Sequence, residues 1–462
     1  MQPEFSSRPP AFPRGERTRI SPAAARFRRR SAARRRAAAR TRFIRFEELE
    51  SRYLLAARVW DGGAGTNNWL DAANWDGNTL PGAGDDVTID VAGSNPTITV
   101  AGNVTIQSLV AREAITFSSG TFTANSVRFD TANGTLSGAR LAGATVETGT
   151  FAQLRMSSGT LDGVTLAAGS QAVTNSNAAI TVLGGLTVDG TLTLGAGAAD
   201  GYGLFFAGDQ TLGGSGHVYL SGNDQRLRLS QANMTLTIGA GLTVHATATT
   251  GSTGIGPHNV ANTHVINHGI LRSEGTGTLN LGAGANGGFL ASFTNAASGT
   301  LESAGGTLTV TAPTFTNQGA VNVAAGTFTI SSATWSNTGA IGHTGGTIHF
   351  GGSFTVAGLG TYNRQNGTAG TTNLTGTLNN AGTTLNLAAS GGWGTWTLAG
   401  GRINGGHVAT SGGGELRLST GTLDGVTLAA GSQAVTNSNA AITVLGGLTV
   451  DGTLTLGAGA AD

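Results

Sequence analysis

Short runs of alternating apolar and polar residues recur along most of the chain. The clearest run spans residues 180–194, where three arms of the form apolar-Thr-apolar begin six residues apart, at Ile180, Leu186 and Leu192. Alternate residues of a strand point to opposite faces, so the apolar residues of each arm can share one core while the threonines face outward. Glycine-containing corners separate the arms, because glycine lets the backbone turn where a Cβ would clash. The pattern predicts short strands joined by tight corners.

Arms of this length cannot bury an apolar face alone and must stack on copies of themselves, which is typical of a solenoid. A β-hairpin is the alternative interpretation, because Asp189-Gly190 between alternating residues is a strong hairpin signal. We favour stacking. Since parallel crossovers are right-handed in nearly all cases, we predict an all-β fold, a right-handed parallel β-helix. At about twenty residues per turn its body would contain roughly 18 turns.

A repeat of aromatic residues gives this turn length. Aromatic side chains recur at intervals near twenty residues, at Phe293, Phe315, Trp335 and Phe354. Near them, asparagines lie shortly before glycines, at Asn267, Asn295, Asn317, Asn337 and Asn380. Asparagine tolerates the left-handed backbone conformation, and its amide can bond an asparagine stacked above or below. We expect these asparagines at corners and the aromatic side chains stacked inside.

Residues 159–200 recur without change as residues 421–462, which makes the chain an array with an internal duplication at an offset of 262 residues. In the first copy Asp200 leads directly into Gly201–Phe206 and further strands. A solenoid needs a cap over its last turn. We therefore expect the sequence to be a fragment whose continuation resembles Gly201–Phe206, with a cap or anchor beyond it.

The composition excludes several classes of protein. The chain has 76 glycines, 11% charged residues and no cysteine, so it has no disulfide framework and no Cys-ligated metal. Its aliphatic residues alternate too regularly for a disordered chain. No apolar run approaches the roughly 18 residues of a membrane-spanning helix. A long, thin core with a Thr-, Ser- and Asn-rich exterior is the remaining interpretation.

The N-terminal part is basic. Residues 1–58 contain 16 Arg and 5 Glu, and residues 1–42 are rich in Arg, Ala and Pro without an apolar stripe, which predicts a disordered tail. Such a tail could bind nucleic-acid phosphates. Nothing suited to reading bases accompanies the arginines, so we favour a tail that is removed or unfolded and expect no nucleic-acid partner.

Residues 43–58 have apolar side chains at helical spacing, which predicts a short amphipathic helix. Within it, Leu49, Glu50, Arg52, Leu54 and Leu55 match a known pattern. The segment resembles the LEPR-XLL motif of very large secreted bacterial surface proteins, with serine at position 51 where the family has proline. The resemblance implies export and a secreted, cell-surface or outer-membrane-associated protein.

Residues 59–92 contain three of the chain's six tryptophans, Trp60, Trp69 and Trp75, with Pro81-Gly82 close behind. The segment resembles the opening of autotransporter-like and filamentous-adhesin-like β-helix proteins. Bulky aromatic side chains can cover the open end of a first turn, so we interpret residues 59–92 as an N-terminal cap and residues 93–462 as the repeat body. The alternative is a glycan platform, with Trp69 and Trp75 stacking on sugar rings.

The histidines and glycine-rich stretches do not predict a cofactor or metal site. His264 and His268 have a zinc-binding spacing for a helix, but on a strand their Cα atoms would lie about 13 Å apart. We interpret them, with His258, as surface histidines. Gly213–Val218 lacks the aspartate of a calcium-binding repeat, and no helix pattern follows the glycines of Gly282–Gly287.

The carboxylates do not predict a catalytic residue. Asp162 and Asp189 precede glycines and are typical of corners. The other acidic residues between positions 159 and 462 that have no duplicate are dispersed along the chain: Asp209, Asp224, Glu274, Glu302 and Glu415. Arg226 and Arg228 share the outward face of a predicted strand, where they could bind an acidic glycan or form a surface ion pair.

The leading hypothesis is therefore a secreted or cell-surface structural or adhesive β-helical protein without a catalytic site, whose partners would be extracellular polysaccharides or cell-surface components. The alternative is a β-helix that binds or degrades polysaccharides, as a lyase or hydrolase. A third hypothesis is a nucleic-acid binder that acts through the arginine tail.

Overall fold

The structure is a computed structural model that describes residues 57–195, 201–284, 286–364 and 370–457. All of them belong to one compact unit, Tyr53–Asp462. The predicted disordered tail lies outside the described residues. So does the predicted helix at 43–58, except for its last two residues, which are extended and begin strand β1 (Ala57–Val59).

The described residues form forty strands and three very short helical segments. The first half of the strands is β1 (Ala57–Val59), β2 (Asp86–Ile89), β3 (Thr97–Ala101), β4 (Val104–Thr105), β5 (Ser108–Ala111), β6 (Ala114–Ser119), β7 (Thr121–Thr123), β8 (Ser126–Phe129), β9 (Gly134–Ala142), β10 (Thr145–Thr148), β11 (Leu154–Leu166), β12 (Gln171–Val188), β13 (Thr191–Leu194), β14 (Gly203–Phe206), β15 (Gln210–Gly213), β16 (His217–Leu220), β17 (Arg226–Leu229), β18 (Thr235–Ile238), β19 (Thr243–Ala246) and β20 (Ser252–Pro257).

The second half is β21 (His264–Asn267), β22 (Ile270–Ser273), β23 (Thr278–Leu281), β24 (Ser292–Asn295), β25 (Thr300–Val310), β26 (Thr314–Asn317), β27 (Ala320–Ile330), β28 (Thr334–Asn337), β29 (Ala340–His343), β30 (Thr347–Phe350), β31 (Ser353–Thr355), β32 (Thr361–Arg364), β33 (Thr371–Leu374), β34 (Thr377–Asn379), β35 (Thr384–Asn386), β36 (Trp396–Asn404), β37 (His407–Ala409), β38 (Leu416–Leu428), β39 (Gln433–Val450) and β40 (Thr453–Thr455). The helical segments are η1 (Ala72–Asn74), η2 (Asp76–Asn78) and α1 (Val356–Leu359).

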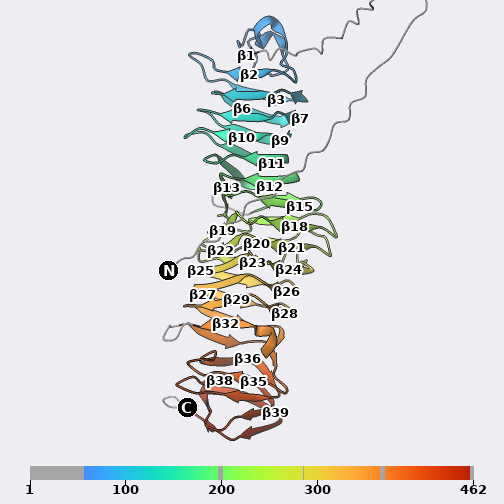
Figure 1. Cartoon of the computed structure of the whole chain (residues 1–462). Helices are drawn as coiled ribbons and strands as arrows, with labels where there is room; N and C mark the ends of the chain where they lie inside the picture. Colours follow the sequence, from blue (N-terminus) through green and yellow to red (C-terminus); the bar gives the residue numbers. More distant parts are fainter. Residues whose placement is uncertain (1–56, 196–200, 285, 365–369, 458–462) are drawn as a thin grey trace, which may run out of the picture. The chain divides into compact units, whose positions relative to one another are not determined.

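The strands wind into a parallel β-solenoid of about 17 turns. Each ladder between named strands is parallel, and a strand pairs with those one turn before and after it, as β19 does with β16 and β22 (Figure 1). Asp189 and Gly190 join β12 to β13, and β13 pairs in parallel with the start of β12 at Gln171–Val173. The predicted stacking is confirmed, and the hairpin interpretation is wrong.

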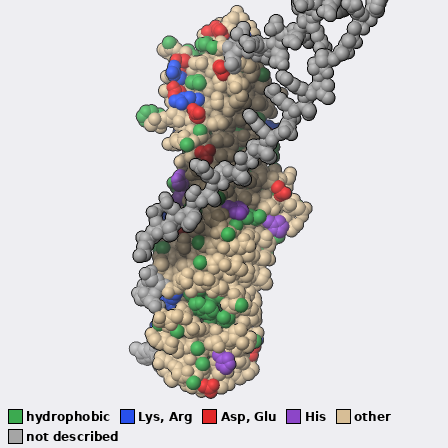
Figure 2. Space-filling model, viewed as in Figure 1, with side chains coloured by type: hydrophobic (Ala, Val, Ile, Leu, Met, Phe, Trp, Pro, Cys, Tyr) green, Lys and Arg blue, Asp and Glu red, His purple; other side chains and the backbone are tan. Residues whose placement is uncertain are grey.

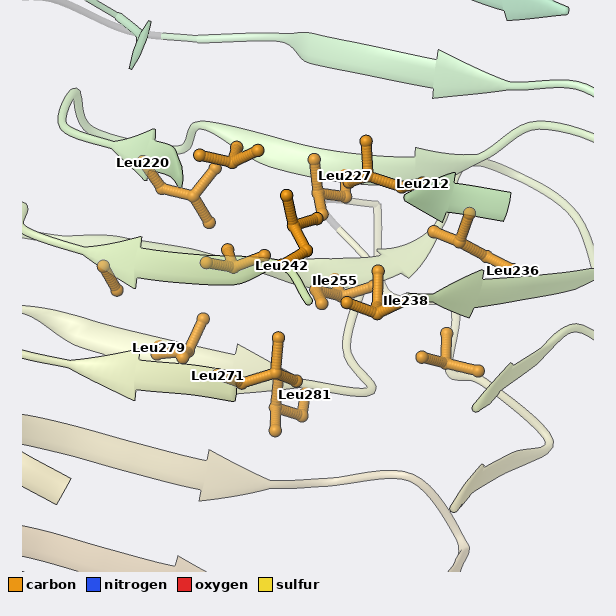
Figure 3. Packing of buried hydrophobic residues seen from close by; sticks show 14 of the residues in the cluster. Leu212, Leu220, Leu227, Leu236, Ile238, Leu242, Ile255, Leu271, Leu279 and Leu281 are labelled. Atoms are coloured by element: carbon orange, nitrogen blue, oxygen red, sulfur yellow. The ribbon is translucent and has the colours of Figure 1, made fainter. Parts of the chain in front are cut away.

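The core is a column of apolar side chains from alternate strand positions. Leucine and isoleucine side chains of successive turns lie in contact along this column (Figure 3). The predicted aromatic stack is present: Phe293 pairs with Phe315 and Phe315 with Trp335 in neighbouring strands, and all three are buried. In-register stacking therefore places like side chains one above another inside the solenoid.

Four of the five asparagines near the glycines form the expected ladder, but not with the expected backbone, while Asn380 donates to the Gly405 and His407 carbonyls instead. Asn267 donates to Asn295 (2.8 Å), Asn295 to Asn317 (2.7 Å) and Asn317 to Asn337 (2.7 Å) through their side-chain amides. All four are buried. They are the last residues of β21, β24, β26 and β28, and none has a positive φ. The left-handed backbone expected for these asparagines is therefore wrong. Asparagine occupies these positions because its side chain points inward and bonds the next asparagine, and not because of its backbone torsion.

A glycine at one corner is required by the close approach of two turns. Gly214 has a φ of 111°, and a Cβ added there would lie 2.1 Å from the carbonyl oxygen of Val188. Ser215 beside it donates its backbone N–H and its hydroxyl to the Asp189 carboxylate. The glycine-rich stretch after β15 is therefore a corner that lies directly on the preceding turn.

A buried histidine interrupts the apolar core at β29. His343 is fully buried, its Nδ1 lies 2.8 Å from the Tyr362 hydroxyl, and that hydroxyl lies 2.7 Å from Thr372 Oγ1. Burial lowers the pKa of His343 below its ordinary value of 6.5, and the nearby Arg364 lowers it further. Burial also raises the pKa of Tyr362 to about 12, so the network is uncharged at neutral pH.

Acid should therefore destabilise the solenoid through His343. The unfolded chain takes up a proton near pH 6.5, whereas the folded protein takes it up only at lower pH. The stability due to neutral His343 is complete above pH 6.5 and is lost as the pH falls below it. We expect the urea midpoint to fall between about pH 7.5 and about pH 5, and to fall less in His343→Gln. Equal falls in both proteins would exclude His343 as the cause.

Candidate functional site on the outer face

One part of the outer face, over β16, β19, β22 and β25, carries larger polar and aromatic side chains than its surroundings. The register places Tyr219 opposite His245, His245 opposite Arg272, and Arg272 opposite Glu302. Neighbouring parallel strands lie about 4.8 Å apart. Four side chains that are 26 to 30 residues apart in sequence therefore form one file along the solenoid.

A series of hydrogen bonds joins two histidines and a glutamate, and one of the histidines, His245, belongs to this file. His217 Nδ1 lies 3.0 Å from His245 Nε2, and His245 Nδ1 lies 2.9 Å from Glu274 Oε1. An ionised carboxylate only accepts, so His245 Nδ1 carries its proton and His245 Nε2 accepts from His217 Nδ1. The lone pair of His217 then resides on Nε2. Since His217 is exposed, His245 is buried and Glu274 is partly exposed, the series passes through a buried imidazole and ends on a ring nitrogen of the exposed His217.

Neighbouring side chains fix the position of His245. The Tyr219 ring stacks on the His245 ring with centroids 4.5 Å apart and an angle of 14° between the planes. Arg272 Nε lies 3.0 Å from Glu274 Oε1 and 3.5 Å from Glu302 Oε2. Glu274 and Glu302 are dispersed along the chain, but they lie close together in space, because the turn between them brings both to the guanidinium of Arg272. The group, named here the histidine file, comprises His217, Tyr219, His245, Arg272, Glu274 and Glu302.

The chemistry open to the histidine file is hydrogen bonding and proton transfer. Imidazole nitrogens can both donate and accept hydrogen bonds, and a neighbouring carboxylate can accept one. The described residues contain no group of three or more His, Asp or Glu side chains arranged to hold a metal ion. His264 and His268 contact different serines, Ser292 and Ser298, and do not converge.

Arg226 and Arg228 do face away from the core, as their alternation with leucine predicts, but they are covered. Their relative exposures are 8% and 3%. Both guanidinium groups bond the Asp224 carboxylate, and Arg226 also donates to the Ala283 carbonyl. Arg228 also lies against the rings of Tyr202 and Phe205, and its burial lowers its pKa. Both groups are therefore committed to internal partners and expose little surface, while the predicted glycan contact stays a prediction.

The tryptophans of the predicted glycan platform are also buried. Trp69 and Trp75 are 1% and 0% exposed. Their rings pack edge to face at 4.7 Å, Trp75 packs on Trp60 at 5.0 Å, and Trp69 packs on Phe122 of a following turn at 5.7 Å. The Trp75 indole N–H donates to the Trp69 carbonyl. The three rings close over the start of the core and present no face to a sugar.

Most of the charged side chains in Figure 2 lie over the first turns. There Asp90, Arg112, Asp130, Arg128 and Glu147 form a chain of ion pairs. Hydrogen bonds from Arg128 and Arg112 lower the pKa of Asp130. Each carboxylate is paired with an arginine near the surface, so the group is typical of surface ion pairs between turns and not of a binding site.

Comparison with known proteins adds no identification. No family model, no curated protein and no solved structure matches the chain. None of the described helices is long and apolar enough to cross a membrane.

Proposed function

We propose that the protein is a structural or adhesive repeat protein, exported to the cell surface, whose right-handed β-solenoid presents a long polar face. The observation that carries the proposal is the use of one 42-residue sequence twice in the same stacking register, β11 on β12 and β38 on β39. A stalk is lengthened by adding turns, since each turn contacts only its neighbours. A second copy of an active site would have no comparably simple use. The LEPR-XLL resemblance of residues 49–55 supports export.

A second candidate, binding or cleavage of a polysaccharide, is favoured by the histidine file. His217 offers an exposed basic nitrogen, and Arg272 and Glu302 lie on the same face, so a glycan could meet both a base and charged hydrogen-bonding groups. Under the structural proposal, the side chains of the histidine file instead form contacts between neighbouring turns. The two functions make different predictions for Glu274: replacing it should reduce turnover if the protein cleaves a polysaccharide, and should change nothing if the protein is structural.

An assay of the whole chain on neutral and uronic-acid polysaccharides tests both. The structural function predicts no turnover above a buffer control and no change in the variant Glu274→Gln. Glu415→Gln is the matched control, because Glu415 is also ion-paired to an arginine but lies far along the chain from the histidine file. Turnover that is lost in Glu274→Gln and kept in Glu415→Gln would overturn the structural proposal and establish the second candidate.

A further inference from the structure

A groove of about 490 Å³ lies on the outer face of the solenoid, where a corner of β12 meets the corner before β15. The register shows how it arises. The same corner spans residues 161–164, 182–186 and 206–212 in three successive turns, so it lengthens from turn to turn. The loops beside β15, β18 and β21 accordingly extend further from the axis than those beside β11 (Figure 1). The longer corner therefore forms a ledge next to the two shorter ones.

Glycine leaves the backbone of this groove uncovered. Gly163, Gly184, Gly185 and Gly213 all line it. Gly184 and Gly185 have φ values of 63° and 83°, a left-handed backbone that glycine adopts without strain. Since these residues have no side chain, a ligand in the groove can approach the backbone closely.

Gln210 fixes the shape of the groove. Its Oε1 accepts from the backbone N–H of Gly185 at 3.2 Å, and its Nε2 donates to the Val182 and Ala207 carbonyls at 3.0 Å and 2.9 Å. The side chain thus ties the long corner to the shorter corner of the preceding turn. A ligand would meet a groove that is already formed, which reduces the entropy lost on binding.

The polar groups of the groove suit a ligand that donates hydrogen bonds. Asp209 is exposed, and its Oδ1 accepts from the Thr235 backbone N–H at 2.7 Å. A carboxylate has about four acceptor sites, so Asp209 retains capacity for a ligand. The hydroxyls of Thr187 and Thr211 can both donate and accept. Among the described residues that line the groove, none is basic. An anionic ligand would therefore face Asp209 without a compensating cation.

We propose that this groove binds a short stretch of a neutral hexose polysaccharide. Its volume lies within the roughly 300–1,000 Å³ typical of small-molecule sites. Sugar hydroxyls would donate to Asp209 and exchange hydrogen bonds with the two threonines and the glycine backbone, whereas the carboxylate of a uronic acid would be repelled by Asp209. The inference rests on the adhesive part of the proposed function and names its ligand class. It does not involve the histidine file, which lies on β16, β19, β22 and β25.

The test measures binding to the whole chain by isothermal titration calorimetry. The probes are hexasaccharides of α-1,4-linked glucose, β-1,4-linked glucose, β-1,4-linked mannose and α-1,4-linked galacturonic acid. We expect at least one neutral hexasaccharide to bind, and the galacturonic acid hexasaccharide to bind at least tenfold more weakly. Asp209→Asn should weaken binding of the neutral sugar roughly tenfold, because a carboxylate accepts a stronger hydrogen bond than an amide. The asparagine can still accept from Thr235, so this variant should fold.

Gly213→Leu should abolish binding by filling the groove. A Cβ added at Gly213 meets only the Thr211 methyl group, at 3.5 Å, so the leucine fits the backbone and enters the open space. Gly342→Leu is the matched control. Gly342 is also an outward-facing strand residue, and a Cβ there would lie 3.5 Å from Asn322 Oδ1. This variant should bind as the parent does, and circular dichroism checks the fold of both.

The outcomes decide the proposal. If no neutral hexasaccharide binds, or if the galacturonic acid hexasaccharide binds more tightly, the proposal is wrong. Parent-like affinity in Asp209→Asn or in folded Gly213→Leu would also overturn it, because the sugar would then bind elsewhere. The proposed function fails on a different result, turnover that is lost in Glu274→Gln. Binding without turnover supports both, and absence of binding overturns only the groove.

Discussion

Replacing Val188 by aspartate should lower the free energy of unfolding by on the order of 4 kcal/mol, while the same replacement at Val450 should lower it by less than about 1 kcal/mol. Val188 is fully buried and Val450 is 42% exposed, although both occupy the same place in identical 42-residue sequences. Strand propensity and local turns are equal at the two sites. The comparison therefore isolates the cost of placing a carboxylate between stacked turns.

Denaturant unfolding followed by circular dichroism measures this difference. Thr187→Asp provides a second control, because Thr187 neighbours Val188 on the outer face and is only partly buried. A solenoid can unfold turn by turn, so hydrogen exchange should show whether the loss in Val188→Asp is centred on β12 and the turns on either side of it. Equal midpoints for Val188→Asp and Thr187→Asp would contradict the assignment of inward and outward faces.

Removing one amide from the asparagine ladder should have the second largest effect. Asn317 accepts from Asn295, donates to Asn337 and donates to the Gly319 carbonyl (3.2 Å). In Asn317→Ala the two neighbouring amides lose a partner inside the solenoid. Asn337 Oδ1 loses its donor, whereas Asn295 Nδ2 keeps the carbonyls of Gly299 and Ala320 as acceptors. A buried polar group without a partner costs about 1–3 kcal/mol, so we expect a loss of about that size.

The control for the ladder is Gln318→Ala. Gln318 is the next residue, also carries an amide, and is exposed. Its replacement should change stability by less than about 0.5 kcal/mol. If both variants unfolded at the same urea concentration, the buried ladder would contribute nothing beyond an exposed amide. The total loss of stability in the double variant Asn295→Ala/Asn317→Ala should be less than the sum of the losses in the two single variants, because the two side chains share one hydrogen bond.

The fold could be predicted because its determinants are local. Alternation over three or four residues sets which side chains enter the core, and glycine marks the corners, so the parallel stack follows from short stretches such as residues 180–194. The prediction for Arg226 and Arg228 shows the limit of this reasoning. Alternation places them outside correctly, but the groups that cover them come from elsewhere, including the Ala283 carbonyl 57 residues away from Arg226.

The histidine file was missed because the turn length is not constant. The aromatic repeat suggested about twenty residues per turn, yet His217, His245 and Glu274 are separated by 28 and 29 residues. With about twenty residues per turn, His217, His245 and Glu274 would be assigned to different faces of the solenoid. A search for like strands spaced 26 to 30 residues apart would have found the signal, since strands β16, β19 and β22 follow one another at that interval.

The identical registers of the two copies also bear on how such a gene changes length. Residues 159–195 and 421–457 stack in the same register, so the offset of 262 residues from one copy to the other returns the chain to the same local arrangement of strands. Unequal recombination between the two stretches would insert or delete 262 residues and rejoin the chain in phase. The apolar column would stay continuous at the junction. Length can thus vary between generations of the gene without a new fold having to evolve.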